Sequence, residues 1–145
     1  MEGPNSLDDN IIYLIGETSR LIHKKVTKVF SDRGFDVTAE QFGILVVLWY
    51  KEGIRQQDIA VTLNRDKTTI ARIAENMISR GLIVKVPDQV DKRNKLIYLT
   101  KKGKLLQKQM IASSGSVYIQ SLKDFSNEEL TMGLKIIRKI MINLK

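Results

Sequence analysis

The stretch of residues 65–80 constrains the fold of this chain more than any other. Its apolar residues recur at three- and four-residue steps, which predicts one buried face of a helix. These residues are Ile70, Ile73, Ala74, Met77 and Ile78. A second set follows the same period and carries only hydrogen-bond donors and short polar groups: Arg65, Thr68, Thr69, Arg72 and Asn76. The stretch therefore predicts a helix with one apolar and one donor-rich face.

The first turn of this predicted helix is cationic. Asp66 is placed to cap the helix, which puts Lys67, Thr68 and Thr69 in its first turn. A cation there opposes the helix dipole, which favours negative charge at the start of a helix. The misfit is explained if the turn meets an anion such as a phosphate.

The residues on either side of this helix complete a larger motif. Residues 55–62 predict a short helix, and the connector to the next helix, Asn64 and Arg65, is short enough for a helix-turn-helix. Gly81 is placed to end the second helix, because glycine tolerates a left-handed backbone. Residues 82–86 and 95–99 then predict two strands, joined by a polar loop with cations at its tip. This order of elements predicts a winged helix.

The chain resembles the MarR family of bacterial transcription regulators. The matching motifs are Thr38-x-x-Gln41, Asp58–Ile–Ala60, Arg80–Gly–Leu82, Asp88-x-x-Asp91–Lys92–Arg93 and Leu99–Thr100-x-x-Gly103. The family wing usually has two arginines after its second aspartate, whereas the first is Lys92 here. A lysine keeps the charge but lacks the planar guanidinium fork. We therefore expect Lys92 to contact phosphate and Arg93 to enter a groove.

The resemblance implies a mainly helical fold with a small β-hairpin wing, in which a winged helix-turn-helix is joined to a helical dimerisation region. We expect residues 1–34 to form the first helix of that region, residues 35–104 the DNA-binding domain, and residues 105–145 the last helices. The implied function is a sequence-specific regulator, which we expect to be a repressor. It would bind a pseudo-palindromic operator as a homodimer and leave it when a small aromatic or phenolic effector binds between the lobes.

The charge distribution favours double-stranded DNA as a partner. Residues 51–104 hold 13 Lys and Arg against 6 Asp and Glu, whereas the rest of the chain holds 11 against 10. Nearly all of the net charge of +8 therefore belongs to the winged-helix segment. A solvated cationic face is the plain alternative for a basic run that has no motif. The residues that we expect to contact DNA are Arg65, Lys67, Thr68, Thr69, Arg72, Asn76, Lys92, Arg93 and Lys95.

The terminal segments predict helices with more apolar surface than one small domain covers. Residues 1–6 predict a loose arm, and Ser6 is placed to cap a helix that runs to about Phe30. A later helix runs from Thr100 to about Lys123, and we expect residues 113–116 to interrupt it with a kink or a close helix–helix approach. The last helix has an apolar stripe formed by Leu130, Leu134, Ile137, Met141 and Leu144. A two-fold homodimer built from the first and last helices would bury this surface.

An effector site is predicted only indirectly. Trp49 ends an apolar helix, and we expect it to line a cavity with Tyr13 and His23 of the first helix. A lone histidine can titrate near neutral pH. The plain alternatives are that Trp49 belongs to the core and that His23 is an exposed side chain with no special task.

Composition and motifs exclude several other classes. The chain has no cysteine, so it has neither disulfides nor a thiol redox sensor. Since no nucleophile–base set, carboxylate pair, phosphate loop or metal-ligand spacing is present, we expect no enzyme, no cofactor and no metal. We see no signal peptide or membrane span and expect a soluble, cytoplasmic protein. Two alternatives stay open: a regulator without a small-molecule effector, and a winged helix used only for protein contacts.

Overall fold

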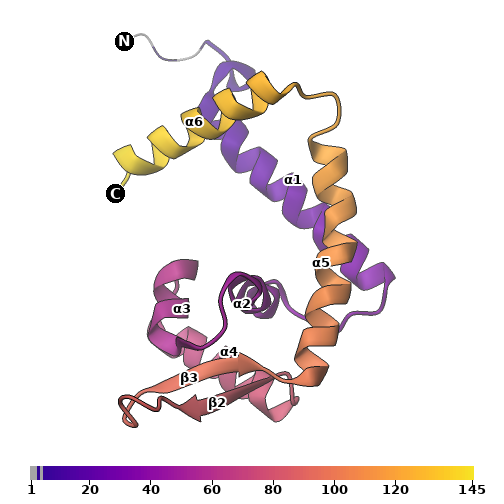
Figure 1. The fold of residues 1–145 in the computed structure, drawn as a ribbon. Helices are drawn as coiled ribbons and strands as arrows, with labels where there is room; N and C mark the ends of the chain where they lie inside the picture. Colours follow the sequence, from indigo (N-terminus) through magenta and orange to yellow (C-terminus); the bar gives the residue numbers. More distant parts are fainter. Residues whose placement is uncertain (1–2, 4) are drawn as a thin grey trace.

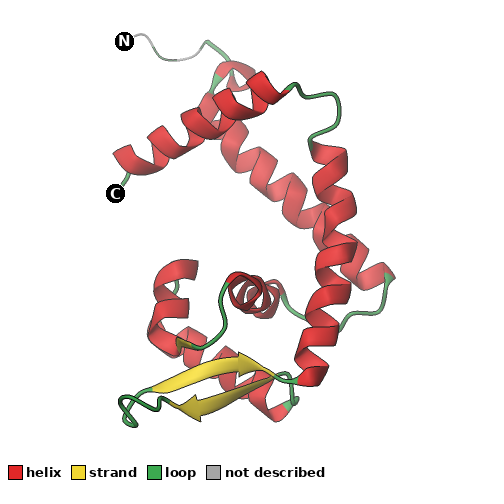
Figure 2. Ribbon diagram, viewed as in Figure 1, coloured by secondary structure: helices red, strands yellow, loops and turns green. Residues whose placement is uncertain are grey.

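The computed structural model describes residue 3 and residues 5–145, and it is mainly helical with one small antiparallel sheet (Figure 2). The winged-helix lobe consists of α2 (Ala39–Tyr50), β1 (Ile54–Arg55), α3 (Gln56–Leu63), α4 (Lys67–Ser79), β2 (Ile83–Pro87) and β3 (Lys95–Leu99). The helical arm consists of the short 3-10 helix η1 (Leu7–Asp9), α1 (Ile11–Asp32), α5 (Lys101–Ser121) and α6 (Asn127–Asn143). Figure 1 shows α6 crossing the start of α1, while α5 runs from the arm into the lobe. The predicted fold class is confirmed.

The first long helix begins later than the sequence predicts. Asn10 caps α1, and its side-chain oxygen accepts hydrogen bonds from the backbone N–H groups of Ile12 and Tyr13 at 3.0 and 3.1 Å. The prediction that Ser6 caps this helix was wrong, because Ser6 instead donates its hydroxyl to Asp9 at 2.9 Å ahead of a short 3-10 turn. The predicted loose arm of residues 1–6 lies partly outside the described residues.

Three phenylalanines join α1 to the winged-helix lobe. The ring of Phe30 on α1 meets those of Phe35 and Phe42 edge to face, at centroid distances of 5.9 and 4.8 Å. Edge-to-face pairs add about 0.5–1.5 kcal/mol to the gain from burial alone. The helix α2, which carries Phe42, begins with a capping box, in which the side chains of Thr38 and Gln41 bond each other's backbone N–H.

The core fills the space between α2, α3, α4, the sheet and the lobe end of α5. Its fully buried large side chains come from all of these elements: Ile44, Leu45, Ile59, Ile70, Met77, Leu82, Ile83, Ile97 and Met110. Burial of each contributes about 1.5–3 kcal/mol relative to exposure. The apolar face predicted for residues 65–80 is thus confirmed as the buried face of α4. Gly81, with a φ of +70°, ends α4 as predicted.

The sheet has one strand more than the sequence predicts. β2 and β3 pair in antiparallel register, with Ile83 opposite Leu99 and Lys85 opposite Ile97, as expected for the wing. β1 adds a third strand on the other side of β3, so that the order is β1-β3-β2. β1 was not predicted because a strand of two residues is too short to show an alternation of apolar and polar side chains.

α5 is continuous where an interruption was expected. Residues 113–116 stay helical, and the three serine hydroxyls among them bond backbone carbonyls of the same helix: Ser113 to Gln109 at 2.7 Å, Ser114 to Ile111 at 3.0 Å and Ser116 to Ser113 at 2.8 Å. The predicted interruption was wrong, but the alternative prediction of a close helix–helix approach agrees with the burial and packing of this segment. Ser113 is only 1% exposed, and α5 packs against α1. The predicted domain boundary between residues 104 and 105 falls in the first turn of α5.

The start of α5 is locked against the end of α4 by a close backbone contact. Thr100 caps α5, and its hydroxyl also donates to the carbonyls of Gly81 and Leu82 at 2.6 and 3.2 Å. A Cβ added at Gly103 would lie 1.9 Å from the carbonyl oxygen of Leu82. The glycine of the Leu-Thr-x-x-Gly motif is therefore required by the approach of two backbones, since backbone atoms cannot move aside as a flexible side chain can.

Replacing Gly103 by alanine should therefore destabilise the fold by about 1–3 kcal/mol, because the added methyl group overpacks a rigid site. Gly115→Ala in the same helix is the matched control. Nothing lies within 4 Å of a Cβ at Gly115, so alanine there should stabilise by about 0.5–1 kcal/mol. Urea unfolding of both variants measures the difference. Equal stabilities would show that the backbone contact is absent in solution.

Candidate nucleic-acid interface

The outer face of α4 presents cations and hydroxyls to solvent. Lys67, Thr68 and Arg72 are exposed, whereas Ile70, Ile73 and Ala74 on the other face of the helix are buried in the core. Within residues 5–145, neither Lys67 nor Arg72 forms an ion pair. Their charges are therefore available to an anionic partner.

Thr69 differs from its neighbour because it belongs to the helix cap. Asp66 accepts the backbone N–H of Thr69 at 2.7 Å and its hydroxyl at 2.6 Å. These two bonds hold the pKa of Asp66 below its usual range, with the hydroxyl contributing most. The cap thereby fixes the start of α4, and the Thr69 hydroxyl has no proton left to donate to a ligand. Thr68 keeps its donor.

Asn76 lies two turns further along α4, and its side chain has a partner in the lobe. Its side-chain oxygen accepts a hydrogen bond of 2.7 Å from the amide of Gln41 on α2. Because the oxygen is taken, the exposed side chain offers its two amide protons to solvent or to a ligand. Asn76 is thus held toward α2, away from the residues of the wing.

Two aspartates fold the wing loop between β2 and β3. Asp88 accepts the backbone N–H of Val90 at 3.0 Å, and Asp91 accepts that of Arg93 at 3.1 Å. Asp91 also pairs with the Arg93 guanidinium at 3.0 and 3.1 Å, and this arginine holds the pKa of Asp91 below its usual range. The exposed guanidinium of Arg93 therefore has a preferred direction at the tip of the wing. Lys92 beside it is exposed and forms no ion pair within residues 5–145.

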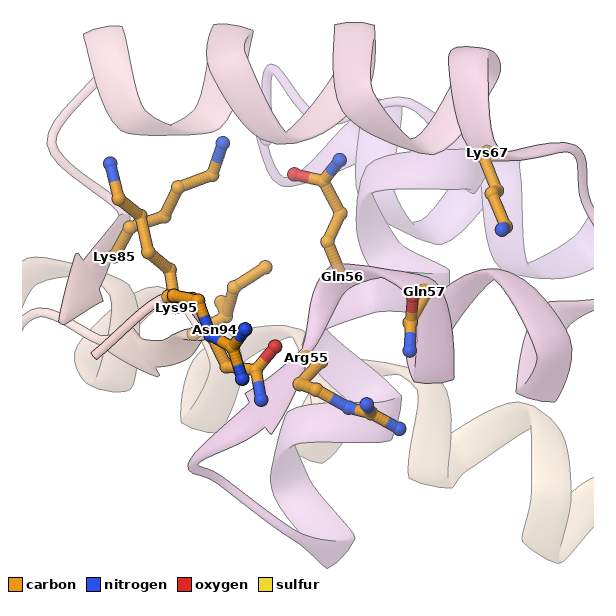
Figure 3. A pocket seen from close by; sticks show the side chains of 9 residues that line it. Arg55, Gln56, Gln57, Lys67, Lys85, Asn94 and Lys95 are labelled. Carbon is orange, nitrogen blue, oxygen red and sulfur yellow. The ribbon is translucent and has the colours of Figure 1, made fainter. Parts of the chain in front are cut away.

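A cationic hollow of about 330 Å³ lies between the starts of α3 and α4 and the wing. Figure 3 shows Lys85, Lys95 and Gln56 extending toward α4, with Lys67 on the first turn of that helix. The hollow brings together three predicted residues, Lys67, Arg93 and Lys95. The full lining is Arg55, Gln56, Gln57, Lys67, Lys85, Arg93, Asn94, Lys95 and Ile97, which includes five cations and no carboxylate.

Carboxylates outside the hollow hold some of these cations in place. Asp58 pairs with the Arg55 guanidinium at 3.0 and 3.1 Å, and Glu75 accepts the Lys85 ammonium at 2.7 Å. Each arrangement lowers the pKa of its carboxyl group, mainly through the side-chain hydrogen bond. In contrast, Lys95 forms no ion pair within residues 5–145.

The contribution of β1, α3 and β2 to the hollow was not predicted from the sequence. Arg55, Gln56, Gln57 and Lys85 were not among the predicted contacts, because their nearness to the wing depends on tertiary packing. One local signal existed: Lys85 interrupts an apolar strand. The side-chain oxygen of Gln56 is buried and has no hydrogen-bond partner among the described residues. An unsatisfied acceptor beside a cationic hollow indicates a site that takes a further donor or a water.

The remaining predicted residues lie elsewhere. Arg65 is exposed on the other side of the α4 start, beside a smaller hollow that includes His23 and Glu40. His23 also lines a cavity of about 560 Å³ between α1 and the start of α2. Tyr13 and Trp49 do not line that cavity, and Trp49 is 51% exposed. The structure thus does not bring together the three residues predicted to bind a ligand.

Neither a metal site nor a membrane-spanning helix is present in the part of the chain that the structure describes. No group of three or more His, Cys, Asp or Glu side chains is arranged to hold a metal ion there. No described helix combines the length and the apolar character needed to cross a membrane.

Comparison with known proteins gives one consistent family. Residues 37–95 match the family model described as MarR family. The transcriptional regulator HosA of Escherichia coli is 29% identical over 106 residues, which cover 73% of this chain and 78% of HosA. The family-model match runs from the residue before the α2 cap to the first residue of β3.

Solved structures agree with the sequence matches. The MepR–DNA complex of S. aureus has a TM-score of 0.85 and 25% identity, covering 97% of this chain and 100% of that one. A putative MarR family regulator from Listeria monocytogenes, complexed with a 26mer DNA, has a TM-score of 0.82 and 28% identity, covering 93% and 89%. The family model, the curated relatives and the solved structures all support the MarR family of winged-helix transcriptional regulators for this chain.

Proposed function

We propose that this chain is a homodimeric, sequence-specific repressor that binds a pseudo-palindromic operator and leaves it when a small aromatic or phenolic molecule binds. The observation that carries the proposal is the placement of the cationic hollow between the exposed face of α4 and the wing. A surface with five cations and no carboxylate suits the DNA backbone, whose phosphates supply most of the affinity.

The geometry supports different roles for the side chains that would contact phosphates and those that would contact bases. With α4 in the major groove, the wing reaches the adjacent minor groove, and one sugar–phosphate strand must pass between them. That strand crosses the hollow, where Lys67 and Lys95 offer unpaired ammonium groups. Arg72, on the second turn of α4, then faces the base edges, while Arg93 faces the minor groove from the wing.

The apolar surface of the helical arm supports a dimer. α6 has no buried residue, and Leu134, Ile137 and Met141 are 55%, 41% and 51% exposed. Ile11, Leu14 and Ile15 of α1 lie beside Ile137 in an apolar depression. A contiguous apolar surface of this kind marks an interaction site. A two-fold axis would cover it with the same surface of a second chain and would present two copies of α4 to two half-sites.

The cavity between α1 and α2 supports release by a small molecule. Phe30, Phe35 and Phe42 give it an aromatic wall, and His23 adds a polar group that can hydrogen-bond a phenol or a carboxylate. Apolar walls with few polar groups are typical of small-molecule sites. The predicted Tyr13 and Trp49 contribute nothing to this lining, so we restrict the proposed effector site to His23 and the phenylalanine wall.

Two substitutions should separate base reading from phosphate binding. Arg72→Ala should cost about 1–3 kcal/mol per half-site on the operator and little on a scrambled duplex, since a bidentate contact to guanine is lost. Lys92→Ala should weaken both duplexes alike and flatten the log–log salt slope by about one unit per lost phosphate contact. Fluorescence anisotropy over a salt series, on an operator selected from a random pool, measures both. If Arg72→Ala weakens both duplexes equally, α4 is not the base-reading helix.

Charging the apolar stripe of α6 should separate the dimer. Ile137→Glu would bury a carboxylate without a partner, and even a neutral polar group left without a hydrogen bond costs about 2–7 kcal/mol. Lys139→Glu is the control, because Lys139 lies on the opposite side of the helix. Sedimentation at micromolar concentration should find monomers for Ile137→Glu and dimers for Lys139→Glu. A dimeric Ile137→Glu would place the interface elsewhere.

A further inference from the structure

Gln41 joins three segments through its single side chain. It is 7% exposed, and its oxygen accepts hydrogen bonds from the backbone N–H of Thr38 at 3.1 Å and from the Arg80 guanidinium at 3.2 Å. Its amide nitrogen donates to Asn76 at 2.7 Å. Both lone pairs of the oxygen are used, so the amide satisfies its partners in only one orientation.

Arg80, at the end of α4, extends the junction to the segment between α1 and α2. Its guanidinium donates a second hydrogen bond of 2.6 Å to the backbone carbonyl of Asp36. The carbonyl of Arg80 in turn accepts a bond of 3.0 Å from the Lys102 ammonium on α5. The C-terminal half of α4 is therefore tied to residues 36–41 by side chains that come from distant parts of the chain.

The same segment forms one wall of the cavity between α1 and α2. Phe35, Val37, Thr38 and Ala39 all line this cavity. Asp36, whose carbonyl bonds Arg80, lies between two of them, and Thr38 itself bonds Gln41. Phe35 also donates its backbone N–H to the carbonyl of Phe30 at 3.0 Å, which ties the segment to α1. A molecule that fills the cavity contacts this wall on one side and the long helix α1 on the other.

We propose that Gln41 is a positioning residue that couples occupancy of the α1–α2 cavity to the placement of Asn76 and α4. This inference rests on the proposed function, because it requires that α4 bind the operator. When the 36–39 segment moves, the oxygen of Gln41 loses a donor, and the amide must turn away from Asn76 to recover one. Asn76 then loses the bond that directs its amide protons outward. Because a buried hydrogen-bond network tolerates few arrangements, the Gln41 amide switches between two orientations and does not move gradually.

Covalent filling of the cavity tests the coupling without knowledge of the natural effector. The chain has no cysteine, so a single introduced thiol reacts alone with benzyl methanethiosulfonate. Thr27→Cys places the benzyl group in the cavity, because Thr27 is exposed to the reagent and lines that space. Lys24→Cys, on the same helix outside the lining, is the matched control. Affinity for the selected operator is measured before labelling, after labelling and after reduction.

Labelling of Thr27→Cys should weaken operator binding by about 5- to 150-fold, the usual range of allosteric coupling, and reduction should restore it. Two further changes break the junction independently. Gln41→Ala removes all three of its side-chain bonds, whereas Arg80→Lys keeps the charge and leaves the α2 capping box intact. In each background the labelling effect should shrink to about twofold or less. Circular dichroism and thermal unfolding accompany each variant.

Three outcomes would overturn the inference. The first is an undiminished labelling effect in both the Gln41→Ala and Arg80→Lys backgrounds, which would mean that Gln41 serves only the stability of α2. The second is an equal effect of the label on Thr27→Cys and Lys24→Cys. The third is an unchanged operator affinity after labelling of Thr27→Cys. Failure of the unlabelled protein to prefer the selected operator would overturn the proposed function as well, and is thereby distinguished from the other three.

Discussion

The burial of one face of α4 is the interaction on which the rest of the structure depends. Ile70, Ile73, Ala74 and Met77 pack against α2, α3 and the sheet, so the opposite face of the helix must meet solvent. The Asp66 cap fixes where the helix starts, and the Gly81 turn fixes where it ends. Because the cap, the turn and the core packing agree, the outer face of α4 holds Lys67 and Arg72 at fixed backbone positions, although neither forms an ion pair within residues 5–145.

The arrangement of the cationic surface lowers the stability of the protein when no anion is bound. Lys67 sits in the first turn of α4, where the helix dipole disfavours a positive charge. Arg55, Lys85 and Arg93 are each held by one carboxylate that lies behind or beside the hollow. The carboxylates direct these side chains while the net charge of the surface remains positive. A polyanion that crosses the hollow would relieve the remaining repulsion among these cations. This relief gives a physical reason why the hollow should attract a polyanion.

Much of this fold is predictable from sequence because its signals are local. The period of Ile70, Ile73 and Met77, the capping box of Thr38 and Gln41, and the Gly81 turn each depend on a few neighbouring residues. The start of α1 was misjudged because Ser6 and Asn10 are both good cap residues, and the preference of a residue type for the cap position does not choose between them. The serines of α5 were misjudged because serine is a poor helix former on its own, yet its hydroxyl can bond a carbonyl of the preceding turn within a continuous helix.

The candidate site was only partly predictable, because its parts come from distant segments. Lys67 and Lys95 were found through charge and motif, whereas Arg55 and Lys85 join them only after β1, β2 and β3 assemble. Likewise, the motif residues Gln41 and Arg80 were recognised by resemblance, but their meeting with Asn76 depends on how α2 packs against α4. No periodicity within one element contains such information.

Lysine acetylation with and without operator DNA tests most directly the claim that α4, the hollow and the wing hold the nucleic acid. Mass spectrometry of the modified chain reports each lysine separately, and Lys135 and Lys139 on α6 serve as internal references. The account predicts that DNA protects Lys67, Lys92 and Lys95 while the two α6 lysines react as before. Protection of Lys135 and Lys139, with Lys67 and Lys95 still reactive, would contradict it.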